Sequence, residues 1–178
     1  ASAALALLRQ AQAQGIAHDA VVLACFGDPG LEALRSDSAA PVVGLAESAM
    51  QQAARRGRTY AIVTAGAAWE GLLTQRLLGW GAGALFTGVQ VIEGTGLDVL
   101  KDPDGALPRV VQAMERARGN GAHTVILGGA VFAGYRDVLQ SHGVPTDDVL
   151  EGVQTAAQVL QSLSPVQALR RGSDSAGI

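Results

Sequence analysis

Cys25 is the only cysteine of the 178-residue chain, and it stands between the apolar run VVLA and the turn FGDPG. A thiolate is a good base and nucleophile, and small residues beside it let backbone N–H groups and the start of a helix approach a ligand. This position predicts a reactive thiol at the mouth of a cleft. The spacing supports a second interpretation equally well, in which Cys25 is a small core residue, because lone cysteines are often buried.

Two more turns of small residues follow apolar runs: TAGA (64–67) comes after AIV, and GGA (128–130) comes after TVIL. Ligands of parallel α/β sheets bind beyond the carboxyl ends of the strands, so the three turns are predicted to share one site. Backbone amides there would hold a carboxylate or enolate oxygen, and Thr64 would add a hydroxyl. The residues expected to present these amides are Phe26, Gly27, Ala65, Gly66, Gly129 and Ala130.

The other polar candidates are assigned mainly structural roles. His123 opens a buried-looking strand, and His142 stands where a helix ends. Glu47, near a helix start, is predicted to cap backbone amides, with a place in the cleft as the alternative. Asp147 and Asp148 form a carboxylate pair, but no histidine or cysteine cluster accompanies them, so no metal site is predicted. No phosphate-binding glycine motif follows a strand, which argues against a nucleotide cofactor.

The apolar pattern alternates between helices and strands. VVLA, AIVT and TVIL are continuously apolar, which is typical of parallel strands covered by helices on both faces, and the predicted class is α/β. The expected strands are 21–25, 41–45, 59–65 and 123–129, with 84–94 mixed strand and loop. The expected helices are 1–14, a segment after Pro29, a helix ending at Arg56, and then 68–79, 105–118, 130–141 and 150–163.

Composition narrows the range of partners. The net charge is −3 and the pI about 5.5, without a run of lysine and arginine, which argues against nucleic acid and anionic membranes. No apolar run approaches the roughly 20 residues that span a bilayer. A single cysteine forms no internal disulfide, so a cytoplasmic location is expected. Small molecules and other proteins are the classes of binding partner that the composition leaves open.

The segment DAVVLACFGDPGLEALR followed by PVVGLAESAM resembles the hydantoin racemases of the aspartate/glutamate racemase superfamily. The likeness continues through IVTAG, VILGGAVFAG and VPTDDVLEGV to about residue 163. It implies an isomerase without a cofactor, built from two similar lobes with parallel sheets flanked by helices and an active site in the cleft between them. A hydantoin or amino-acid derivative is the implied substrate, and a homo-oligomer the implied assembly.

The resemblance also divides the chain. The first lobe is expected at 1–57 plus 148–165, the second lobe at 58–147, and a flexible tail at 166–178. Relatives open with a strand and an asparagine-containing loop, whereas this sequence starts without a methionine at what looks like the following helix. An upstream segment, including the first strand, is therefore expected to be missing from the sequence as given.

In such racemases each lobe contributes one cysteine, and the two thiols face the substrate carbon from opposite sides. Cys25 matches the first cysteine, whereas Gly129 occupies the position of the second. Proton exchange by Cys25 from one side, with water in the space left at Gly129, is the main expectation. The alternatives are a one-cysteine enzyme like the arylmalonate decarboxylases, which keep the cysteine of the second turn, and a non-catalytic binding protein that kept the cleft.

The resulting site has Cys25 and the Gly129 position as its catalytic pair. Phe26 and Trp69 are expected to wall a pocket for an apolar substituent, with plain packing as an equal alternative for Trp69. The substrate-binding residues are expected to be Phe26, Gly27, Thr64, Ala65, Gly66 and Ala130.

Overall fold

The structure is a computed structural model that describes residues 2–81 and 83–174. Its strands are β1 (Val21–Leu23), β2 (Val42–Gly44), β3 (Tyr60–Ala65), β4 (Phe86–Ile92), β5 (Thr124–Leu127) and β6 (Val149–Glu151). Its α-helices are α1 (Ser2–Ala13), α2 (Leu31–Asp37), α3 (Leu45–Arg55), α4 (Ala68–Gly79), α5 (Gly96–Lys101), α6 (Pro103–Gly119), α7 (Tyr135–Ser141) and α8 (Gly152–Asp174). Two short 3-10 helices are η1 (Gly83–Leu85) and η2 (Ala130–Phe132).

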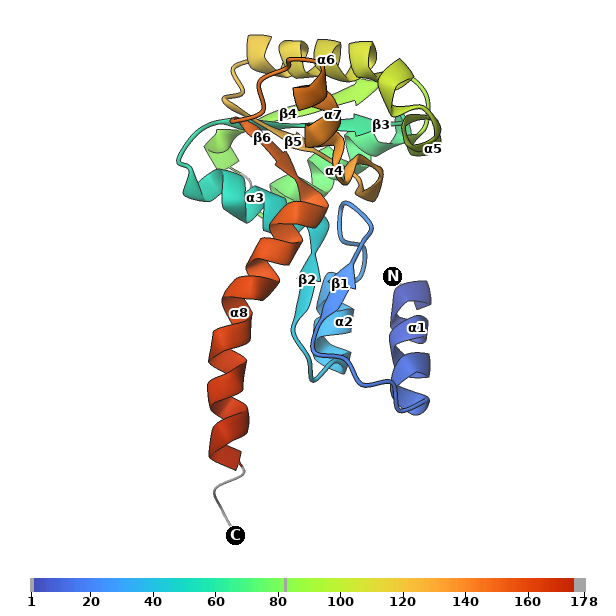
Figure 1. The fold of residues 1–178 in the computed structure, drawn as a ribbon, viewed down its shortest axis with the longest axis vertical. Helices are drawn as coiled ribbons and strands as arrows, with labels where there is room; N and C mark the ends of the chain where they lie inside the picture. Colours follow the sequence, from blue (N-terminus) through green and yellow to red (C-terminus); the bar gives the residue numbers. More distant parts are fainter. Residues whose placement is uncertain (1, 82, 175–178) are drawn as a thin grey trace.

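The strands form two parallel sheets. β1 pairs with β2, and the larger sheet has the order β4-β3-β5-β6. In Figure 1 the β1-β2 pair lies below the larger sheet, flanked by α1 and α2, while α8 runs down its other side. All pairings being parallel, both sheets need helical connections, which explains the alternation of helices and strands along the chain.

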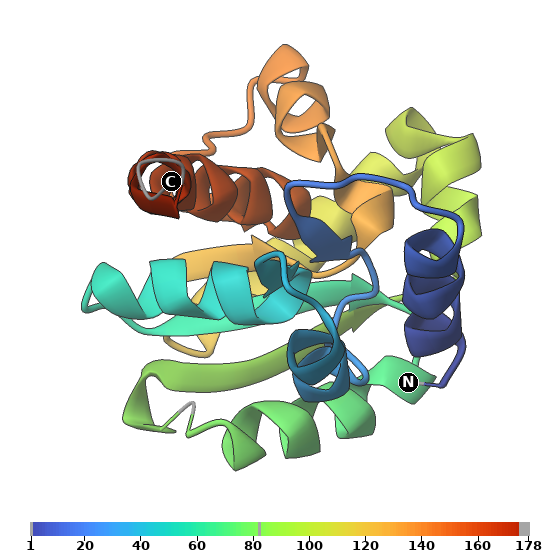
Figure 2. The ribbon, with the colours of Figure 1, turned by 90° about the horizontal axis from the view of Figure 1, so that it is seen from below.

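Helices cover both faces of the larger sheet, and its central strands are apolar on both sides. Ala61 and Val63 of β3 pack with residues of α6 and α7, whereas Tyr60 and Ile62 pack with residues of α3 and α4. In Figure 1, α6 lies above the larger sheet and α3 and α4 lie below it, and Figure 2 shows the molecule from that lower side. Because successive strand residues point to opposite faces, a strand buried on both faces is apolar at most of its positions.

The smaller sheet has its own core. Leu8 of α1, Leu23 of β1, and Leu31 and Leu34 of α2 form one buried cluster, which Val42 of β2 completes. The ion pair of Arg9 with Asp37, at 2.7 Å, joins α1 to α2 on the surface. The two sheets thus belong to separately packed regions, which α3 and α8 connect.

Several elements differ from the expectations. Residues 149–151, predicted to lie in the first lobe at the start of a helix, form β6 and pair with β5 in the larger sheet. β6 has only two apolar residues, ends in Glu151 and runs directly into α8, so the sequence did not separate it from the following helix. The predicted helix 130–141 is divided into η2 and α7 around Gly134.

Two further differences concern α5 and the end of the chain. α5 begins with a capping box in which Thr95 and Asp98 exchange side-chain and backbone hydrogen bonds, a signal that the sequence analysis missed. The flexible tail was predicted from residue 166, whereas the backbone of α8 continues through Asp174. Residues 175–178 of that tail lie outside the described residues.

Within the described residues, no helix has both the length and the apolar character needed to cross a membrane.

Candidate active site

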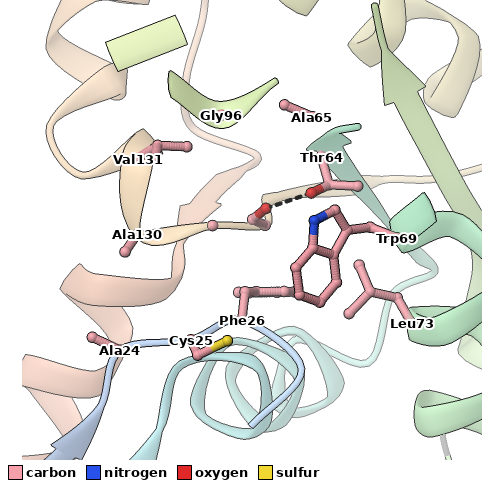
Figure 3. Close-up of a pocket in the computed structure, with 12 residues that line it drawn as sticks. Ala24, Cys25, Phe26, Thr64, Ala65, Trp69, Leu73, Gly96, Ala130 and Val131 are labelled. Atoms are coloured by element: carbon pink, nitrogen blue, oxygen red, sulfur yellow. Dashed lines mark hydrogen bonds between the residues drawn. The ribbon is translucent and has the colours of Figure 1, made fainter. Parts of the chain in front are cut away.

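Residues of all three predicted turns line one pocket between the two regions, but the predicted substrate-binding residues Gly27 and Gly66 are not among them. The volume of the pocket is about 230 Å³. Figure 3 shows Cys25 and Phe26, which follow β1, on one side of the pocket, and Thr64 of β3, Trp69 of α4 and Ala130 of η2 on the other. The complete lining consists of Ala24, Cys25, Phe26, Thr64, Ala65, Trp69, Leu73, Gly96, Gly128, Gly129, Ala130 and Val131.

Cys25 lies in a tight turn directly after β1. The Asp28 amide donates to the Cys25 carbonyl oxygen over 2.9 Å, and Gly27 has φ +100°, a conformation that strongly favours glycine at this point of a turn. The cysteine is half-buried, lines the pocket and also packs against the core of the smaller region. Cys25 therefore lies where both predictions placed it, at the edge of a pocket and against a hydrophobic core.

Asp28 is a buried carboxylate that the sequence analysis did not single out. Its two oxygens accept hydrogen bonds from the amides of Ala46, at 3.1 Å, and Glu47, at 2.8 Å, at the start of α3. Burial raises the pKa of the Asp28 carboxyl to about 6, against these amide hydrogen bonds, which lower it. The cap joins residues 18 and 19 positions apart, so no local spacing could have revealed it.

The predicted capping role of Glu47 is wrong. Its carboxylate pairs with the Arg35 guanidinium through both oxygens, with Nη1 to Oε1 at 3.1 Å, and Arg35 also binds Glu32. Asp28 already accepts the free amides of the α3 terminus, and Arg35 on the neighbouring α2 is within reach of the longer glutamate side chain. Glu47 is also absent from the pocket lining.

Opposite Cys25, the turn after β5 carries no side chain at residues 128 and 129. A Cβ on Gly128 would lie 2.6 Å from Ile62 and 2.9 Å from the Phe26 ring, so this position has no room for one. A Cβ on Gly129 would make ordinary contacts, the nearest at 3.4 Å to Val131. Space for a side chain therefore exists at Gly129, but its φ of +154° disfavours any residue other than glycine.

The amides of this turn are available to a ligand. The hydrogen bonds formed by described residues leave the N–H groups of Gly129, Ala130 and Val131 without an acceptor, and all three residues line the pocket. Three consecutive free donors in a partly closed site can stabilise a developing negative charge on an oxygen.

Thr64 and Phe26 both line the predicted site, but each already has a structural contact: the Thr64 hydroxyl forms a hydrogen bond, and the Phe26 ring is packed in the core. The Thr64 hydroxyl donates to the Gly128 carbonyl oxygen over 2.7 Å (Figure 3). In this arrangement its oxygen can accept from a ligand, whereas its hydrogen is already used. The Phe26 ring is buried, 3.3 Å from where a Cβ on Gly152 would be, and so anchors the Cys25 turn on the larger region.

The pocket is neutral and mostly apolar. Cys25 is the one ionisable side chain among the described residues that line it, and Trp69, Leu73 and Val131 supply apolar walls. Trp69 is 40% exposed, so part of its ring is available at the pocket edge.

The remaining polar candidates lie outside the lining. His142 follows α7 as its C-cap, with Nδ1 2.9 Å from the Val138 carbonyl oxygen, as the helix-end prediction expected. His123 precedes β5, is exposed, and contacts the Thr59 hydroxyl. Asp148 pairs with Arg118. No group of three potential metal-binding side chains occurs within residues 2–81 and 83–174.

Comparison with known proteins gives a consistent match. The family model described as Asp/Glu/Hydantoin racemase matches residues 1–160. A hydantoin racemase from Rhizobium meliloti is 33% identical over 161 residues, which make up 89% of this chain and 65% of the relative. The chain thus spans slightly less than two thirds of that relative's length.

Solved structures agree on the fold. The allantoin racemase from Pseudomonas fluorescens superposes with a TM-score of 0.79 at 30% identity, over 93% of this chain and 70% of that one. A mutant of arylmalonate decarboxylase gives a TM-score of 0.57 at 18% identity, over 88% of this chain and 71% of that one, a likeness of fold alone. The predicted class, α/β with parallel sheets flanked by helices, is confirmed.

Proposed function

The chain belongs to the Asp/Glu/Hydantoin racemase family, and we propose that it uses the Cys25 thiol to exchange the hydrogen on a carbon next to a carbonyl group, without a cofactor. The observation that carries the proposal is the pocket that Cys25 and the free amides of residues 129–131 line together. A base and an oxyanion site on opposite walls are what abstraction of such a hydrogen needs.

The chemical step involves one sulfur and one carbonyl. The Cys25 thiolate takes the proton, so the C–H bond breaks and an S–H bond forms. The electron pair moves onto the carbonyl oxygen, and the enolate is held by the amides of the turn after β5. The reverse step returns a hydrogen from sulfur to the same face of the carbon.

Gly129 determines the expected stereochemistry. With no side chain at 129, the described residues that line the pocket include no second thiol or other ionisable side chain to protonate the carbon from the far side. Exchange in D2O should therefore proceed mainly with retention of configuration. Racemisation requires water to protonate the far face, so it should be slower than deuterium incorporation.

The lining favours a neutral substrate. A free amino acid brings an ammonium group as well as a carboxylate. The free amides of residues 129–131 can accept the carboxylate, but the described lining residues include no carboxylate to pair with the ammonium group. Burying unpaired charges costs several kcal/mol or more, on the order of the whole binding energy of a small ligand. A hydantoin ring is neutral and presents carbonyl and N–H groups that backbone can pair, and an apolar substituent would lie against Trp69 and Leu73.

The test is deuterium exchange with a 5-substituted hydantoin in D2O. Proton NMR follows the hydrogen on the ring carbon, and chiral chromatography follows the enantiomers. We expect exchange above the buffer rate that is lost in Cys25→Ser, which keeps the size of the side chain but lacks the thiol. Exchange equal to buffer, or unchanged in Cys25→Ser, would contradict the proposal.

The single thiol also favours a second candidate, a one-cysteine decarboxylase-like enzyme, in which Cys25 would protonate the enolate left after loss of carbon dioxide. Release of carbon dioxide from an arylmalonate, lost in Cys25→Ser, would identify it. Calorimetric binding of hydantoins with neither exchange nor decarboxylation would instead identify a binding protein that kept the cleft.

A further inference from the structure

Asp28 connects the Cys25 turn to the start of α3. Its amide closes the turn on the Cys25 carbonyl oxygen, at 2.9 Å. Its carboxylate accepts the amides of Ala46 and Glu47 and is fully buried while doing so. The residue that ends the turn is therefore held by α3, a helix that packs against the larger sheet.

Asp28 also connects the turn to the opposite wall. Its carbonyl oxygen accepts a hydrogen bond of 2.7 Å from Nη2 of Arg76 on α4. The same helix supplies Trp69 and Leu73 to the pocket. The Arg76 guanidinium is stacked on Trp80, with its central carbon 4.9 Å from the ring centroid, which limits its movement. Asp28 thus fastens the thiol-bearing turn to a wall of the substrate pocket.

The backbone around Asp28 is adapted to this arrangement. Asp28 has φ +50° and is the one non-glycine residue with positive φ in the described part of the chain. Such a conformation costs about 1–3 kcal/mol and persists where surrounding contacts impose it. A Cβ on Gly44 would lie 2.2 Å from the Asp28 carboxylate, so glycine there makes room for it.

We propose that Asp28 is a positioning residue, which fixes the Cys25 turn against α3 and α4 so that the thiol stays aligned with bound substrate. Its loss is expected to lower the rate of proton exchange more than substrate affinity. The exchange measurement depends on the proposed function, whereas the reactivity of the free thiol does not.

The chain offers a matched control in Glu151. This carboxylate is also buried, and it accepts the amides of Gly134, at 3.1 Å, and Arg136, at 2.5 Å, around the start of α7. It is outside the pocket lining and does not contact the Cys25 turn through any hydrogen bond among the described residues. Glu151→Gln should reproduce the loss of a buried cap without disturbing the thiol.

The experiment compares Asp28→Asn, Asp28→Ala and Glu151→Gln for thermal stability, alkylation of Cys25 by iodoacetamide, and kcat and KM of hydantoin exchange. A misplacement of about 1 Å can lower a rate up to about a hundredfold, so we expect kcat to fall about tenfold or more in Asp28→Ala, with KM changed less than about threefold. Alkylation should become faster, because the released turn exposes the half-buried sulfur.

Asn tolerates positive φ and keeps one acceptor, so Asp28→Asn should recover part of the loss. It also serves as the test if Asp28→Ala does not fold. Glu151→Gln should lose stability while keeping both thiol reactivity and kcat.

The proposal is overturned if the Asp28 variants keep wild-type alkylation rates and kcat, or if Glu151→Gln changes both to the same extent. Faster alkylation in the Asp28 variants alone, in a protein whose wild type shows no exchange, would support the positioning role and reject the proposed function.

Discussion

The turn after β1 and the turn after β5 occupy matching places beside one pocket, yet they are held in opposite ways. Side chains fasten the first: Phe26 is buried in the larger region, and Asp28 caps α3. The second turn is held through its own backbone: the Gly128 amide donates to the Val63 carbonyl oxygen, and the Gly128 carbonyl oxygen accepts from the Thr64 hydroxyl. One turn presents a thiol, and the other presents free amides and space. Similar local geometry therefore supports different chemistry.

The largest effect is expected from a variant that gives the second turn a thiol as well, because both turns would then carry a catalytic side chain. In Gly129→Cys a side chain fits the available space, although the φ of +154° must relax or be retained at a cost of about 1–3 kcal/mol. A general acid on the far face contributes about a hundredfold or more, so racemisation should rise by that factor and approach the exchange rate. Chiral chromatography beside NMR measures the ratio, with Gly129→Ser as the control for size.

The pH dependence of the free energy of unfolding tests the first turn, because Asp28 of that turn is a buried carboxyl and the second turn has no ionisable side chain. The folded pKa of Asp28, about 6, is above its ordinary value of 3.8. Between these values the folded protein binds more protons than the unfolded chain, so the Asp28 contribution is most favourable below pH 4 and is lost as pH rises to about 6. Two pKa units correspond to at most about 3 kcal/mol.

Urea unfolding of the wild type and of Asp28→Asn, measured from pH 4 to pH 7, tests this expectation. The asparagine does not titrate in this range, so the difference between the two free energies of unfolding isolates the contribution of Asp28. The nearby charges of Glu47, Arg35 and Arg76 are present in both proteins and largely cancel. A stability difference that is constant with pH, or that grows as pH rises, would contradict the expected sign.

Packing of the second turn is tested at Gly128. Gly128→Ala places a methyl group 2.6 Å from Ile62 and 2.9 Å from Phe26, and overpacking of this kind costs about 1–3 kcal/mol. Gly119→Ala, at the end of α6 where a Cβ meets nothing within 4 Å, is the control. Equal stability of the two variants in chemical denaturation would mean that Phe26 does not lock the turns together.

The smallest effect is expected at Thr64. Thr64→Val removes the hydrogen bond to the Gly128 carbonyl oxygen while keeping the shape of the side chain. The loss should be about 1 kcal/mol in the free energy of unfolding, since the hydrogen bond is buried and neutral. Exchange should slow only modestly, and loss of exchange with full stability would instead indicate that the hydroxyl contacts substrate.

Long apolar patterns were sufficient to predict most of the fold. The helix expected at 68–79 has these bounds in α4, and the strand expected at 59–65 differs from β3 by one residue. β6 was missed because its two apolar residues are followed by Glu151 and then directly by α8, and its strand character comes from pairing with β5. An apolar run bounded by turn residues is visible in the sequence even where the strand is short, as in β1 and β2, whereas a strand without such a run depends on its pairing partner.

For the site, residue types and their order after apolar runs were enough to select Cys25 and the two other turns, because parallel strands bring their carboxyl ends to one edge. Tertiary structure alone decided which groups hold that thiol. Asp28 reaches α3 across 18 residues, its carbonyl meets Arg76 across 48, and Phe26 fits beside glycines more than 100 residues away. Spacing along a chain records local periodicity, but a cap or a packed ring depends on distances that exist only after the two regions have come together.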